Sequence, residues 1–86
     1  MIDHVDEKVA VIFSSNPATG LVVPRRMLWK GKTYVITKLG YHHPTREGRH
    51  MYHVFEVTDG VNDFRLKLDT ETLHFLLEEV SDGLAA

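Results

Sequence analysis

The chain has 86 residues, 43% hydrophobic and 26% charged, with no cysteine, which predicts one globular domain over residues 1–86 and excludes disulfides, thiolate zinc sites and cysteine nucleophiles. Its formal charge of −2 hides two opposite blocks, because residues 24–53 carry a net charge of +6 and residues 54–86 carry −6. Such blocks either pair with each other in the fold or are presented to a partner.

The first predicted elements are short strands with period-two patterns. Lys8 to Phe13 is a β-branched run that ends at a cluster of turn-forming residues. Residues 21–30 and 32–39 are rich in Val, Ile, Tyr, Trp and Thr, and Gly31 between them predicts a hairpin because glycine accepts a positive φ. The next segment, from Gly40 to Gly48, has no apolar period and predicts a loop.

Two further strands, at residues 51–58 and 61–68, are joined by Asp59-Gly60, the dipeptide that a type I′ turn prefers. A two-residue loop would collect the apolar side chains of both strands on one face, which we expect to be core. A longer loop would change this register. The predicted register pairs Phe55 with Phe64, His53 with Leu66, and Glu56 with Asp63, the last being an unfavourable like-charge pair.

The segment from Asp69 to Asp82 fits two different structures. Its apolar residues recur at helical spacing, and Asp69 or Thr70 could cap a helix there. Phe75 and its neighbours also alternate as they would in a strand. Composition leaves both structures open.

A spaced pattern of aromatic, glycine and apolar positions runs through the chain as P-x-x-x-x-W-x-G-x-x-Y-x-[VI], then D-G, then L-x-L-D-x-x-T. It includes Pro24, Trp29, Gly31, Tyr34, Tyr52, Gly60, Leu66, Asp69, Thr72, Phe75 and Leu77. This pattern resembles a family of short, uncharacterised bacterial domains, whose relatives also look like the tails of some bacterial proteins related to lesion-bypass DNA polymerases. In that family, glycine is usual where this chain has Leu73, and tryptophan is common where it has Phe75.

The resemblance implies a small antiparallel sheet with the tail as its last strand. We therefore predict an all-β fold, a curled sheet or barrel of five to six strands. The alternative is an α+β fold with a C-terminal helix from about residue 70 to 81.

Catalysis and metal binding find little support in the sequence. The histidines at 42, 43, 50 and 53 could converge on a metal ion, but His50 and His53 differ by three, an offset that points side chains to opposite faces of a strand. The adjacent Glu78 and Glu79 would diverge on a strand in the same way, and no serine lies in a nucleophile elbow. We expect no enzyme activity, no metal site and no cofactor.

The predicted function is a non-enzymatic binding or accessory module that mediates protein interaction, with a protein partner or a homodimer. The alternative is single-stranded nucleic-acid binding through residues 24–53, although a pI near 6.3 is low for an autonomous nucleic-acid-binding domain. A protein partner predicts an exposed apolar patch or an open sheet edge, and a nucleic acid predicts a continuous positive face. The predicted binding residues are Arg25, Arg26, Lys30, Lys32, Tyr41, Arg46 and Arg49.

The predicted location is the cytoplasm. The first residues are acidic, unlike a signal peptide, and no apolar run approaches the length of a membrane span. We expect no membrane association.

Overall fold

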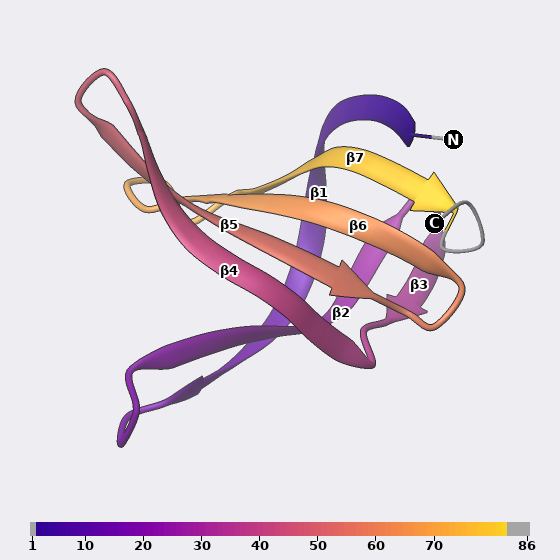
Figure 1. Cartoon of the computed structure of the whole chain (residues 1–86), viewed down its shortest axis with the longest axis horizontal. Coiled ribbons are helices and arrows are strands. Elements are labelled where there is room, and N and C mark those ends of the chain that lie inside the picture. Colours follow the sequence, from indigo (N-terminus) through magenta and orange to yellow (C-terminus); the bar gives the residue numbers. More distant parts are fainter. Residues whose placement is uncertain (1, 83–86) are drawn as a thin grey trace.

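A computed structural model describes residues 2–82, which form a single antiparallel sheet of seven strands (Figure 1). The all-β prediction is confirmed, with more strands than the five to six expected, and the alternative C-terminal helix is wrong. Residues 2–82 contain no helix, and therefore none that could cross a membrane. The strands are β1 (Ile2–Asn16), β2 (Leu21–Trp29), β3 (Lys32–Val35), β4 (Lys38–Glu47), β5 (His50–Thr58), β6 (Asn62–Asp69) and β7 (Phe75–Asp82).

The strand order β3-β2-β1-β7-β6-β5-β4 describes a meander that curls but stays open (Figure 1). Consecutive strands pair with each other except β3 and β4, and the first and last strands pair as well. The pairing of the first strand with the last depends on the length of β1, which extends well beyond the predicted Lys8 to Phe13. Its first half pairs with β7 and its second half with β2, so one long strand joins the two parts of the sheet.

The core lies on the inner face of the curled sheet. Along β6, Phe64, Leu66 and Leu68 are buried and the residues between them are only partly covered, as a strand with one face on the core requires. Met27 from β2 and Leu77 from β7 are fully buried among them. Strands from both halves of the chain therefore share one hydrophobic core.

The β5–β6 register differs from the predicted one by two residues. Phe55 pairs with Leu66, and Glu56 pairs with Arg65 instead of a second acid. The cause is the Asp59 carboxylate, which accepts hydrogen bonds from the backbone amides of Val61 at 2.8 Å and Asn62 at 2.7 Å. These bonds support a four-residue loop of residues 59–62. Because side chains alternate with a period of two, the shift leaves each one on its predicted face.

The prediction of a loop from Gly40 to Gly48 is wrong, because these residues form most of β4. Pairing and stacking, not an apolar period, hold this strand in place, and the His42 ring stacks on Phe55 with centroids 4.5 Å apart. The strand lies at an edge of the sheet, where the missing amide hydrogen of Pro44 is tolerated. A register shift at Gly40 brings the chain so near β5 that a Cβ there would lie 3.3 Å from the Glu56 carbonyl oxygen.

The two hairpins at Gly31 and at the tail show how turns are built here. The predicted hairpin is confirmed, with φ values of 53° for Lys30 and 74° for Gly31, although β3 ends at Val35 and the next residues lead into β4. In the tail, Leu73 adopts a φ of 63°, a left-handed conformation at the position where the resembling family has glycine. Pairing with strands on both sides, β6 and β1, makes β7 a strand despite its helical spacing.

Candidate protein-interaction surface

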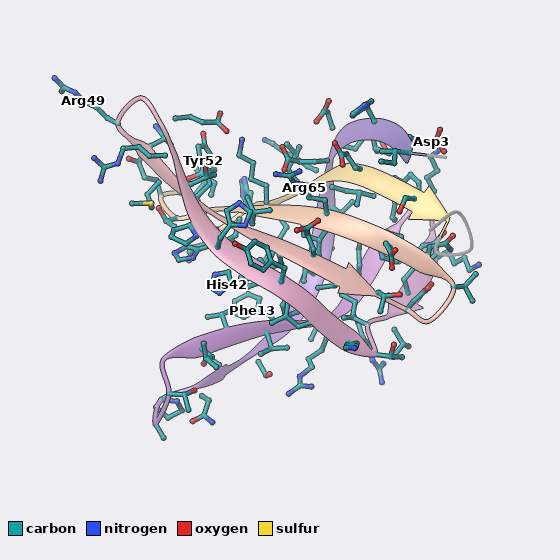
Figure 2. The ribbon with its side chains drawn as sticks, viewed as in Figure 1. Asp3, Phe13, His42, Arg49, Tyr52 and Arg65 are labelled. Atoms are coloured by element: carbon teal, nitrogen blue, oxygen red, sulfur yellow. The ribbon has the colours of Figure 1, made fainter. Side chains whose placement is uncertain are left out.

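The structure divides the seven predicted binding residues into two groups at opposite ends of the strand order. In Figure 2, Arg49 projects from the tip of the β4–β5 hairpin, away from the body of the sheet. The basic segment therefore does not form one continuous strip of neighbouring strands. The first group, Arg25, Arg26, Lys30 and Lys32, lies on β2, at the β2–β3 turn and at the start of β3, and the second, Tyr41, Arg46 and Arg49, lies on β4 and at the β4–β5 turn.

The outward side of β1, β2 and β3 carries an apolar patch that the sequence analysis did not find. Ile12, Leu28 and Val35 are 65%, 49% and 54% exposed, one on each of three neighbouring strands. Directly paired residues share a face, so the patch follows from the register. We call this surface the β1–β3 face, and its residues are Ala10, Ile12, Ser14, Arg25, Arg26, Leu28, Thr33 and Val35.

A β-bulge places both arginines on this face. The β1–β2 register shifts between Ile12 and Phe13, which leaves Arg25 as an extra residue on β2. The Arg25 Nε donates a hydrogen bond of 2.9 Å to the Ser14 hydroxyl, and Ser14 lies on the same side of β1 as Ile12. Arg26 is paired directly with Ile12. The two guanidinium groups therefore lie beside the aliphatic side chains.

The cations of the first group have no acidic partner in the described chain. Within residues 2–81, no carboxylate oxygen lies within 4.0 Å of a side-chain nitrogen of any of the four. The Lys30 ammonium lies 4.8 Å from the centroid of the Trp29 ring, and that of Lys32 lies 5.1 Å from the Tyr34 ring. The Trp29 indole also donates to the Glu7 carboxylate at 2.6 Å, so both aromatic rings already have partners in the fold.

The outward side of β4 to β7 is different, because its charges pair with each other. Lys67 is only 12% exposed and contacts the carboxylates of Glu47 and, at 4.0 Å, Glu78, with its ammonium 4.3 Å from the Tyr52 ring. Burial by itself would lower the pKa of Lys67, but the Glu47 hydrogen bond and the nearby negative charges raise it. We call this surface the β4–β7 face, with Tyr41, His43, Glu47, Tyr52, Glu56, Arg65, Lys67, Glu78 and Glu79.

The acidic half of the sequence pairs mainly away from the first basic group. Glu78 lies 3.5 Å from Arg65, in its own half of the chain, and Glu79 lies 3.4 Å from His4. Glu71 reaches the end of the basic segment at His50, 3.1 Å away. Among the described side chains, the two charge blocks therefore form ion pairs with each other only at His50–Glu71 and Lys67–Glu47, and Arg25 and Arg26 of β2 have no carboxylate partner.

Two shallow hollows lie on the β4–β7 face. The larger, about 470 Å³, is lined by charges of both signs, including Glu56, Arg65 and Glu79, with Tyr41 at its side. The smaller, about 260 Å³, is lined by Lys67 and other residues. Acidic and basic side chains line both hollows together, so neither hollow presents a charge of one sign.

The histidines form a pair on the inner side of the open sheet. The ring nitrogens of His42 and His53 lie 2.8 Å apart, so one ring donates a hydrogen bond to the other. Burial, followed by the charges of His53 and His43, lowers the pKa of His42. Among the side chains of residues 2–81, no three from His, Asp or Glu gather in a way that could hold a metal ion.

The open edges of the sheet are poorly suited to strand addition. β3 has only four residues, and β4 carries Pro44 with the charged Lys38 and Arg46, features that discourage pairing with another chain. Of the two features expected for a protein partner, the apolar patch is therefore the stronger. The sequence could not reveal it, because the apolar run that contains Ile12 does not show which of its faces is covered.

Comparison with known proteins identified no relative of this chain. Models of protein families, curated proteins and solved structures all gave no match to this chain. The resemblance to short bacterial β domains stays a prediction. What is shown is the fold, a small all-β domain whose seven-stranded antiparallel sheet curls without closing.

Proposed function

We propose that this chain is a non-enzymatic interaction module that binds another protein through the β1–β3 face. The observation that carries the proposal is the group of three exposed aliphatic side chains around Arg26 on neighbouring strands, Ile12, Leu28 and Val35. Single exposed apolar residues are ordinary on protein surfaces, but a contiguous patch is typical of an interaction site. Two cations of β2, Arg25 and Arg26, lie beside this patch.

The same surface supports a protein partner better than a single-stranded nucleic acid. Stacking platforms for bases use exposed aromatic rings, whereas the side chains offered here are aliphatic. Trp29 and Tyr34 pack against the core, and lysines of this chain cover them. The second basic group, with Arg46 and Arg49, lies at the other end of the strand order and would not extend the same binding face.

Site-specific photocrosslinking in cells of the source organism tests the proposal. A benzophenone amino acid at position 28 should give a protein adduct of defined mass, and Ile12→Glu should reduce its yield about tenfold because it places a charge in the apolar patch. The matched control is the same crosslinker at Val61, an equally exposed aliphatic residue of the β5–β6 turn. Equal adducts at both positions, or no adduct at Leu28, would contradict the proposal.

A titration with labelled single-stranded DNA and RNA at low and moderate salt tests the alternative. We expect no binding, or weak binding that Ile12→Glu does not change. Tight, salt-sensitive binding that is lost on substitution of Arg25 and Arg26 would replace the protein partner with a nucleic acid.

A further inference from the structure

We infer that the partner segment is acidic and extended, with carboxylates interspersed among branched apolar residues on the side that meets the β1–β3 face. This inference rests on the proposed function and adds the chemistry of the partner. It follows from three features of the face, which are the position of the arginines, the order of side chains in each row, and the lack of internal counter-charges.

The bulge presents two arginines side by side. Their guanidinium groups are planar and can bind a carboxylate through two parallel hydrogen bonds, which a lysine ammonium cannot do. Arg25 is held from one side by the Ser14 hydroxyl, so its orientation is fixed before a partner binds. Because neither arginine has a carboxylate partner among residues 2–81, an incoming acid would not have to displace one of these.

The order of side chains across the strands sets the pattern that a partner must match. Arg26 lies between Ile12 on β1 and Val35 on β3 in one row. Neighbouring strands lie about 4.8 Å apart, and side chains on one face of an extended segment recur about every 6.6 Å. A segment crossing this row obliquely therefore meets an apolar position, a cation and another apolar position in turn. A partner segment that matches this row therefore has an apolar, an acidic and an apolar side chain at every second residue.

A second copy of this chain fits the face poorly. Two β1–β3 faces brought together would place Arg25 and Arg26 of both copies in one apolar interface, where like charges repel strongly. The acids of this chain are already engaged on the β4–β7 face, for example Glu78 with Arg65. Anionic lipid and single-stranded nucleic acid share the negative charge of the inferred partner, so both are arms of the test.

A binding titration with a synthetic peptide tests the inference. The probe is a fluorescein-labelled peptide with valine and glutamate alternating at every second position and serine between them, and its matched control has lysine in place of glutamate. At low salt the glutamate peptide should bind at least about tenfold more tightly than the lysine peptide, and added salt should weaken it. Amide shifts on isotope labelling should map to Ile12, Arg26 and Leu28.

Charge reversal then separates the two basic groups. Arg25→Glu with Arg26→Glu should weaken the glutamate peptide at least about tenfold, while Arg46→Glu with Arg49→Glu, the same charge change at the other end of the sheet, should change it by less than about twofold. Arg25→Gln with Arg26→Gln, a milder pair, should weaken it about threefold and guards against misfolding of the reversed variant.

Four results would overturn the inference: no binding of the glutamate peptide, equal binding of the lysine peptide, equal effects of the two charge reversals, or tighter binding of phosphatidylglycerol vesicles or a single-stranded oligonucleotide at Arg25 and Arg26. A crosslinked protein at Leu28 whose yield ignores the arginine substitutions would also overturn it, and would leave the proposed function standing. Loss of the Leu28 adduct together with intact peptide binding would instead reject the proposed function.

Discussion

The β1–β3 face and the β4–β7 face are two outward surfaces of one sheet, and they differ in whether their cations have carboxylate partners. On the β4–β7 face, Lys67 is nearly buried between Glu47 and Glu78, and Arg65 lies 3.5 Å from Glu78. On the β1–β3 face, Arg25 and its neighbour have aliphatic side chains around them and no carboxylate within 4.0 Å in the described chain.

This difference teaches that net charge along a sequence does not identify a binding surface. Both faces contain cations, but those of the β4–β7 face contribute to the stability of the fold itself. On the β1–β3 face, Arg25 and Arg26 lie beside exposed aliphatic side chains and have no carboxylate partner among the described side chains. Substitutions that remove one interaction from each face therefore give the sharpest test of the comparison.

The largest contrast is expected between two leucines on opposite sides of the sheet. Leu66→Ala should reduce the free energy of unfolding by about 2–5 kcal/mol because Leu66 is fully buried, while Leu28→Ala should change it by less than about 0.5 kcal/mol. Urea denaturation measures both. A similar loss for both variants would show that Leu28 belongs to the core and that the β1–β3 face is not a free surface.

A smaller contrast is expected between two lysines. Lys67→Ala should cost about 1–2 kcal/mol of unfolding free energy, because it leaves the Glu47 carboxylate without its cation, takes one of two cations from Glu78 and removes the ammonium over the Tyr52 ring. Lys32→Ala, on the other part of the sheet, should cost less than about 0.5 kcal/mol. A double-mutant cycle of Lys67→Ala with Glu47→Ala measures the coupling, and a coupling near zero would contradict a structural role for this pair.

The turn between β6 and β7 should respond in the opposite direction. Leu73 is exposed and has a φ of 63°, a conformation that costs a branched side chain free energy and glycine almost none. Leu73→Gly should therefore raise the free energy of unfolding by up to about 1 kcal/mol. Leu73→Ala keeps the unfavourable φ and serves as the control in thermal and urea unfolding. Equal effects of both would mean that the gain comes from removing apolar surface.

The smallest effect is expected from the pair of His42 and His53. The fold lowers the pKa of His42 below its ordinary value of 6.5, so the unfolded chain binds more protons on mild acidification. The contribution of His42 to the free energy of unfolding should be fully present above about pH 6.5 and should be lost as the pH drops below that value. In His42→Gln, urea denaturation at a series of pH values should show a shallower loss over this window. An unchanged pH profile would assign the loss to other groups.

Part of the fold could be predicted from local patterns. The hairpin at Gly31 and the core face of β5 and β6 could be predicted from turn residues and from the alternation of apolar and polar residues. The β5–β6 register differs from the predicted one by two residues, and an even shift keeps each side chain on its predicted face. The strand β4 could not be predicted in the same way. It lacks an apolar period, and its position depends on stacking of His42 against Phe55 on the next strand.

The candidate surface was predicted in part. Arg25 and Arg26 were identified from the charge of their segment, but Ile12 and Val35 were not, because an apolar strand residue reads the same whether its side chain meets the core or solvent. The register across three strands decided this, and it involves residues that are far apart in the sequence.

The sequence by itself determined that strands dominate this chain and that it has a basic middle and an acidic end, because turn residues, period-two patterns and charge are local properties. The same local patterns left the segment from Asp69 to Asp82 open between a strand and a helix. Only the tertiary structure decided what those charges do. Because β1 pairs with β7, the basic strands β2, β3 and β4 lie toward the two ends of the strand order, and the acidic strand β7 lies at its centre. Distance between side chains, which determines pairing energy, depends on that topology and not on position along the chain.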